Sequence, residues 1–132
     1  MKKILFVCTG NSCRSQMAEG LARNLGWEAY SAGTKPEIEV SPNAIKAMAE
    51  INLDISNHYP KLVEEIELNK MDVIMTVCSN ADENCPVFPG FNGKKIHHSF
   101  DDPANATGTN KEILAVFCRV RDEIKDYLIK NL

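Results

Sequence analysis

The sequence predicts an α/β fold in which a parallel β-sheet carries helices on both faces. Short apolar runs at 4–7 and 73–77 have the length and composition of strands that are buried on both sides. Amphipathic stretches with helical spacing alternate with such runs, and the clearest of them lies at 113–128. This alternation favours a parallel sheet, because the helices that connect parallel strands pack on its faces.

Length and composition predict one domain, 1–132, which we expect to be a cytoplasmic monomer. The 132 residues are 44% hydrophobic, which is enough for one compact core. A net charge of −3 without a long basic run argues against a nucleic-acid partner. No apolar run resembles a membrane span or a signal peptide. In a reducing cytoplasm, five cysteines indicate catalysis or redox chemistry more than structural disulfides.

The first strand, 4–7, passes directly into a loop and a helix. The loop at 8–15 consists of small, turn-prone residues. From Ser15 onward apolar residues recur at helical spacing as far as Gly26, which is suited to cap the helix. A second strand is expected at 28–32.

The middle of the chain predicts two further helices. Ser41-Pro42 is a helix start, with Ser as the cap and Pro in the first turn, and the helix should run to about Asn52. The polar residues at 56–58 resemble another cap, before a short helix around 62–66.

Two more strands and a long helix complete the expected order. The strand at 73–77 stops at a polar loop with Cys78 and Cys85 at its ends, and a weaker strand at 95–100 stops at Asp101-Asp102-Pro103. The apolar stripe at 113–128 then predicts the last helix.

The loop at 8–15 has the features of an oxyanion site. Successive N–H groups of a tight loop form a concave nest, and the following helix adds its positive end. Arg14 adds a planar cationic fork that matches a tetrahedral oxyanion. The same groups would stabilise the thiolate of Cys8, which is the nucleophilic form. A buried inert Cys8 beside a solvated Arg14 is the alternative, but the Cys-x5-Arg spacing between strand and helix favours a site.

The loop carries a family resemblance. Residues 8–15 match the Cys-x5-Arg-Ser loop of the low-molecular-weight protein tyrosine phosphatases, and the longer stretch Cys-Thr-Gly-Asn-Ser-Cys-Arg-Ser-Gln-Met-Ala-Glu-Gly resembles their relatives, the thioredoxin-coupled arsenate reductases. The resemblance extends over nearly the whole chain, through the runs at 100–104 and 119–124. It implies a flavodoxin-like three-layer sandwich with strand order 2-1-3-4.

Reactive side chains stand at the ends of three predicted strands, namely Cys8, Cys78, and the pair Asp101 and Asp102. Ligands of an open parallel sheet bind beyond the carboxyl ends of its strands, so we expect one site at this edge. A carboxyl group on the stiff Asp102-Pro103 loop could serve as general acid, or simply form a turn. The resemblance favours Asp102, the residue directly before proline, over Asp101.

Two features favour the reductase branch over the phosphatase branch. Phosphatases of the family usually carry an aromatic residue after the proline, where this chain has Ala104. A phosphatase also has no need of the Cys78 and Cys85 pair. The resemblance implies that these two cysteines act in turn, forming first a Cys8–Cys78 disulfide and then a Cys78–Cys85 disulfide that thioredoxin reduces.

The resemblance also implies roles for the remaining loop residues. Arsenate would bind to the loop residues Thr9, Gly10, Asn11, Ser12, Cys13, Arg14 and Ser15. Ser15 would hydrogen-bond the Cys8 thiolate, and Asn11 would brace the loop backbone. We expect a structural role for Cys13 and an inert thiol at Cys118. The two alternatives are a phosphatase acting on phosphotyrosine or small phosphates, and a non-enzymatic oxyanion or redox sensor.

No cofactor is expected. The spacing of His97-His98 fits no zinc pattern. Some arsenate reductases of this type bind potassium through residues that match Asn11, Glu19 and Ser31, but a carboxylate expected nearby falls at Lys61. An ammonium group there could replace the ion, so potassium dependence is not expected.

Overall fold

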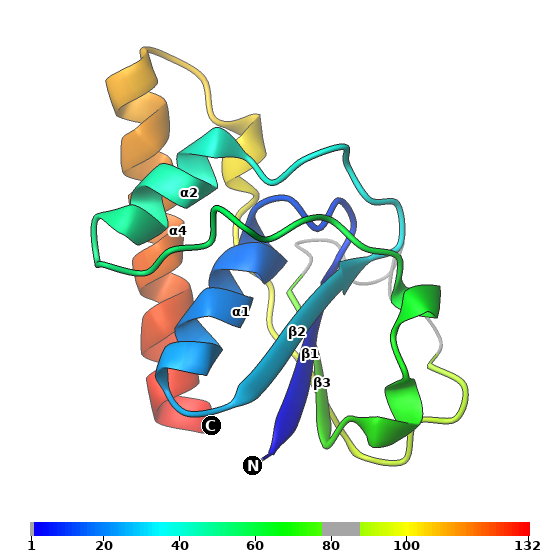
Figure 1. Ribbon diagram of the computed structural model, residues 1–132. Helices are drawn as coiled ribbons and strands as arrows, with labels where there is room; N and C mark the ends of the chain where they lie inside the picture. Colours follow the sequence, from blue (N-terminus) through cyan, green and yellow to red (C-terminus); the bar gives the residue numbers. More distant parts are fainter. Residues whose placement is uncertain (1, 78–87) are drawn as a thin grey trace.

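The computed structural model describes residues 2–77 and 88–132 (Figure 1). Its strands are β1 (Lys3–Cys8), β2 (Glu28–Gly33), β3 (Val73–Thr76) and β4 (Lys94–His97). Its α-helices are α1 (Arg14–Asn24), α2 (Pro42–Ala49) and α4 (Asn110–Asn131). Short 3-10 helices are η1 (Val63–Glu65), η2 (Leu68–Lys70) and η3 (Pro103–Asn105).

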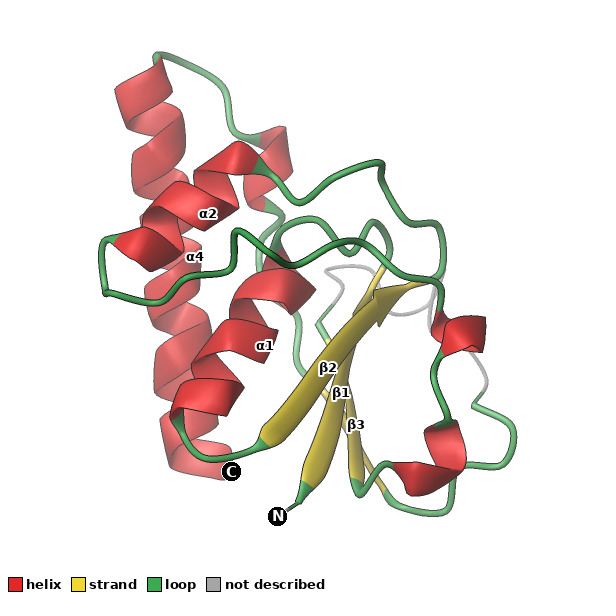
Figure 2. Cartoon of the chain, viewed as in Figure 1, coloured by secondary structure: helices red, strands yellow, loops and turns green. Residues whose placement is uncertain are grey.

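The strands form a parallel sheet in the order β2-β1-β3-β4. The predicted α/β class and the 2-1-3-4 order are therefore confirmed. Cys8 pairs with Gly33 and Val7 with Thr76, so the carboxyl ends of β1, β2 and β3 finish at the same edge. Helices α1, α2 and α4 lie on one side of the sheet, and η1 and η2 lie on the other (Figure 2).

The central strand β1 is apolar from Ile4 onward because it is buried on both faces. Ile4 and Phe6 are fully buried in a core with the helices α1 and α4. Leu5 and Val7, also fully buried, belong to a second core that includes Val63 of η1. Successive side chains of a strand point to opposite faces, so a strand with a core on each side reads as a continuous apolar run.

Helix α2 begins where the sequence predicts, and its regular part ends three residues before the predicted Asn52. Ser41 stands at the N-cap position, but its hydroxyl makes no capping bond, and its N–H donates to the carbonyl of Ser12 instead. The predicted position of the serine cap is therefore confirmed, although the hydroxyl does not bond to the helix. At the other end Asn52 has φ +63°, and the N–H of Leu53 donates to the carbonyl of Met48 at 3.0 Å. This left-handed closure ends the helical turn at the predicted residue, three residues beyond the regular helix.

The remaining elements match the sequence in kind more than in length. The helix expected around 62–66 is the single 3-10 turn η1, and β4 is a short, mostly exposed edge strand. Helix α4 begins before its apolar stripe because Thr109 and Glu112 form a capping box. Within the described residues, the helices are too short or too polar to span a membrane.

Candidate active site

The loop between β1 and α1 is held by backbone hydrogen bonds from the segment that follows β2 (Figure 1). Three loop carbonyls accept hydrogen bonds from N–H groups of that segment: Thr9 from Lys35 at 2.9 Å, Gly10 from Glu37 at 2.8 Å and Ser12 from Ser41 at 2.9 Å. In a trans peptide the N–H points opposite to the C=O. The N–H groups that follow these carbonyls therefore point to the inner side of the loop, where they form a nest suited to an oxyanion.

Two residues permit this tight path. Asn11 is fully buried and has φ +50°, a left-handed conformation that asparagine tolerates better than most residues. Gly33 packs against the loop so closely that a Cβ atom there would lie 2.5 Å from the carbonyl oxygen of Thr9. A side chain at position 33 would thus force the loop to move.

Cys8 lies at the end of β1 with its sulfur inside the loop. It is 2% exposed, and its Sγ accepts the N–H of Asn11 at 3.2 Å and lies 2.9 Å from Oγ of Ser15. The side-chain amide of Asn11 donates to the same Oγ at 2.7 Å, so the Ser15 hydroxyl proton is free to point at the sulfur. Cys8 therefore lies among donors that stabilise a thiolate.

Arg14 connects this loop to the ends of β3 and β4. The guanidinium is nearly buried, with Nη1 donating to the carbonyls of Phe100 at 3.2 Å and Val77 at 3.4 Å. Its Nη2 lies 3.5 Å from Oδ2 of Asp102. The structure thus brings Asp102, which is far away in sequence, to the loop that carries Cys8 and Arg14.

The structure also separates the two candidate acids. Asp101 is turned outward and pairs with Arg119 of α4 at 3.1 Å, with 73% of its side chain exposed. Asp102 faces Arg14, while its Oδ1 accepts the N–H of Ala104 at 3.0 Å. Asp102 is therefore both the turn-forming residue of η3 and the carboxyl group next to the loop.

The family model described as low molecular weight phosphotyrosine protein phosphatase matches residues 3–132. The chain belongs to this family. Within it, the arsenate reductase of Halalkalibacterium halodurans is 51% identical over 126 residues, which is 93% of this chain and 89% of that protein. The arsenate reductase of Bacillus subtilis is 49% identical over 130 residues, covering 96% of this chain and 92% of that protein.

Solved structures of similar proteins include both branches of the phosphatase family. An arsenate reductase in its phosphate-binding state superposes with a TM-score of 0.81 at 31% identity, over 98% of this chain and 95% of that one. A low molecular weight protein tyrosine phosphatase from T. tengcongensis superposes with a TM-score of 0.71 at 28% identity, over the whole of both chains.

Cys13 and Cys118 lie in surroundings that differ from those of Cys8. Burial raises the pKa of the Cys13 thiol, whose Sγ lies 3.6 Å from the hydroxyl of Ser12, so it stays protonated. Burial likewise raises the pKa of Cys118, which donates to Glu50 at 3.4 Å. The predicted redox pair, Cys78 and Cys85, lies outside the described residues, and so do both predicted disulfides.

His97, the last residue of β4, and its neighbour His98 contact different partners. His97 lies 2.6 Å from the Thr76 hydroxyl, whereas His98 stacks against Phe100 and Tyr127. In the described part of the chain, no three histidine, cysteine or acidic side chains are grouped so that they could hold a metal ion.

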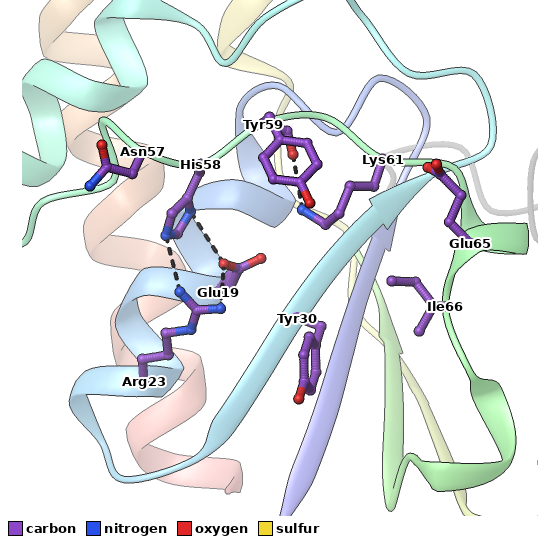
Figure 3. Close-up of a pocket in the computed structure, with 9 residues that line it drawn as sticks. All are labelled: Glu19, Arg23, Tyr30, Asn57, His58, Tyr59, Lys61, Glu65 and Ile66. Carbon is purple, nitrogen blue, oxygen red and sulfur yellow. Dashed lines mark hydrogen bonds and ion pairs between the residues drawn. The ribbon is translucent and has the colours of Figure 1, made fainter.

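A pocket of about 620 Å³ adjoins the loop, and it is lined in part by Lys61, whose backbone N–H donates to Oδ1 of Asn11 (Figure 3). Glu19 is buried there; its Oε1 accepts from Ser31 at 2.7 Å and its Oε2 lies 3.0 Å from Arg23. Lys61 points its ammonium group into the same pocket, donating to the carbonyl of Tyr59 at 2.9 Å. Glu19 is thus already paired with Arg23, and the ammonium group of Lys61 lies in the same pocket.

Sequence reasoning missed Gln16 and His58 as parts of this region. Gln16 is fully buried in the first turn of α1, and its amide contacts both the loop and His58. Neither spacing nor residue type marked them, because one follows the loop motif and the other resembles a helix cap. A buried polar side chain is informative only when its partners are known.

Proposed function

We propose that this protein reduces arsenate to arsenite, with Cys8 as the nucleophile. The observation that carries the proposal is the buried Cys8 sulfur inside a loop of N–H donors, with the Arg14 and Asp102 pair beside it. The two relatives named arsenate reductase, each about half identical to this chain, support arsenate as the oxyanion.

The first step forms a sulfur–arsenic bond. The Cys8 thiolate attacks arsenic while the loop N–H groups and Arg14 neutralise the oxyanion. One arsenate oxygen leaves as water after Asp102 protonates it. The product is a covalent Cys8 adduct in which arsenic is still pentavalent.

The second step transfers two electrons to arsenic. The thiolate of Cys78 attacks the Cys8 sulfur, the sulfur–arsenic bond breaks, and its electron pair stays on arsenic, which leaves as arsenite. The Cys8–Cys78 disulfide is then attacked by Cys85, which restores Cys8 and forms the Cys78–Cys85 disulfide. Thioredoxin, a dithiol, reduces this last disulfide. Such a relay needs a reducing compartment, so we also propose a cytoplasmic location.

The second candidate is hydrolysis of a phosphate ester through a phosphocysteine at Cys8. It is favoured by the phosphotyrosine phosphatase family model, and the same loop and acid would serve it. The absence of an aromatic residue at Ala104 disfavours phosphotyrosine as its substrate.

We further propose that the reaction needs no metal and no potassium. The proposal is supported by the ammonium of Lys61 in the pocket that holds Glu19. Burial lowers the pKa of Lys61, while Glu19 acts in the opposite direction and favours the charged form. The chain thus carries its own cation at this place.

The decisive experiment is arsenate-dependent NADPH oxidation in the presence of thioredoxin and thioredoxin reductase. The wild type and Cys118→Ser should turn over, whereas Cys78→Ser should complete at most one slow cycle. Full turnover by Cys78→Ser would contradict the relay. A wild type that is silent with arsenate and hydrolyses an aryl phosphate would instead be a phosphatase.

A further inference from the structure

The carbonyl of Asn11 is held differently from the other loop carbonyls. Those of Thr9, Gly10 and Ser12 accept from backbone N–H groups, whereas that of Asn11 accepts from Nε2 of Gln16 at 3.1 Å. The same nitrogen donates to the carbonyl of Tyr59 at 3.1 Å. A carbonyl oxygen can only accept, so the NH2 end of the amide must face these two oxygens.

The orientation of Gln16 also fixes the tautomer of His58. Oε1 of Gln16 lies 3.0 Å from Nδ1 of His58, so Nδ1 carries the proton, which it shares with Glu19 at 3.3 Å. Nε2 is then left to accept from Arg23, whose Nη1 lies 3.3 Å away (Figure 3). Burial lowers the pKa of His58, which favours the neutral ring that this pattern requires. A chain of donors therefore runs from Arg23 through His58 and Gln16 to the loop, and each bond polarises the next.

The backbone of Asn11 needs such a support. Its φ of +50° is sparsely populated for a residue with a side chain, and such conformations persist only where the surroundings hold them. The Asn11 N–H is held by Cys8, and the side chain by Ser15 and the N–H of Lys61. The bond from Gln16 acts on the remaining freedom, the rotation of the peptide between Asn11 and Ser12.

We propose that Gln16 is a positioning residue that fixes this peptide and thereby aims the Ser12 N–H at the bound oxyanion. The N–H of Ser12 points opposite to the Asn11 carbonyl. When Gln16 holds the Asn11 carbonyl on the outer side of the loop, the Ser12 N–H points to the inner side. There it lies beside the N–H groups that follow the carbonyls of Thr9, Gly10 and Ser12. The inference rests on the proposed function, since it assigns a donor for the same oxyanion.

Two variants test this role. Gln16→Met removes both ends of the amide at similar volume, and Gln16→Glu keeps an acceptor for His58 but loses the donor to Asn11. The probe is inorganic phosphate, which should protect Cys8 from iodoacetamide, with alkylation of each cysteine followed by peptide mass spectrometry. Loss of one hydrogen bond predicts a rise of about tenfold in both the phosphate Kd and the KM for arsenate. Interactions made equally with substrate and transition state affect KM alone, so kcat should change by less than about threefold.

The matched control is Leu21→Ala, on the same helix. Leu21 is 2% exposed in the helical core, so its truncation should lower Tm without changing KM. Equal phosphate protection in the wild type and both Gln16 variants would overturn the inference. The inference would also be overturned if Leu21→Ala raised the KM for arsenate as much as the Gln16 variants do. If phosphate fails to protect Cys8 in the wild type, the oxyanion site itself is refuted, and the proposed function with it.

Discussion

Replacing Ser15 by alanine removes the hydroxyl that lies 2.9 Å from the Cys8 sulfur. Because Asn11 donates to this hydroxyl, the hydroxyl in turn can donate to the thiolate. Ser15 and Asn11 are fully buried, so water cannot readily replace either bond. The variant therefore weakens the nucleophile and leaves the Asn11 amide without this acceptor.

The expected loss follows from the strength of a hydrogen bond to a charged group. Such a bond contributes roughly 1.5–3 kcal/mol. Since each 1.36 kcal/mol corresponds to a factor of ten, kcat/KM should fall roughly 10- to 150-fold. The coupled arsenate assay measures this loss, and the rate of Cys8 alkylation at neutral pH, resolved by peptide mass spectrometry, should fall with it.

Ser31→Ala is the matched control for this variant. It removes an equally buried hydroxyl whose bond goes to Glu19 and not to Cys8. It should lower stability but leave Cys8 alkylation within about twofold of the wild type. If Ser15→Ala stays folded and keeps kcat/KM within that same range, Ser15 does not support the thiolate and our reasoning about the loop is refuted.

Three further predictions concern the surroundings of the loop. Asp102→Asn should lower kcat by about 10²- to 10⁴-fold in the coupled assay, whereas Asp101→Asn should be close to wild type, because Asp101 pairs with Arg119 outside the site. The wild type should turn over equally in potassium chloride and choline chloride, whereas Lys61→Asp, which adds a carboxylate near Glu19, should become faster with potassium. Burial lowers the pKa of His58 below 6.5, so the unfolded chain binds this proton more readily than the folded one. The free energy of unfolding, measured in urea, should thus be highest above about pH 6.5 and should fall as the pH is lowered further. In His58→Gln this fall should be smaller.

Each of these predictions has a contrary outcome. Equal losses in Asp101→Asn and Asp102→Asn would remove the distinction between the two acids. A wild type that needs potassium would show that Lys61 does not replace the ion. An unfolding free energy with the same pH dependence in wild type and His58→Gln would show that His58 is not held neutral in the fold.

The strands and the loop could be predicted because their signals are local. An apolar run such as 4–7 is typical of a strand that is buried on both faces. The small residues and Arg14 that follow it are typical of a loop that binds an oxyanion. The approach of Asp102 to the loop of Cys8 could also be predicted, because parallel strands end at one edge of the sheet.

Features that depend on tertiary partners could not be predicted. Ser41 is the N-cap of α2, as predicted, but the hydrogen bond from its backbone N–H to Ser12 is a contact that only the folded chain creates. Gln16 looks like an ordinary helix residue until Tyr59 and His58 are placed beside it. Edge strand β4 is mostly exposed, so its limits left little hydrophobic signal.

The hydrogen bonds that hold the loop from outside have a consequence for protein engineering. Three of its carbonyls are anchored by Lys35, Glu37 and Ser41, and Gly33 packs closely against it. A peptide that contains only β1, the loop and α1 lacks all of these anchors, so it should not adopt the oxyanion-binding shape. Grafting the signature onto another scaffold would therefore also require the strap from Gly33 to Ser41, which carries no reactive group of its own.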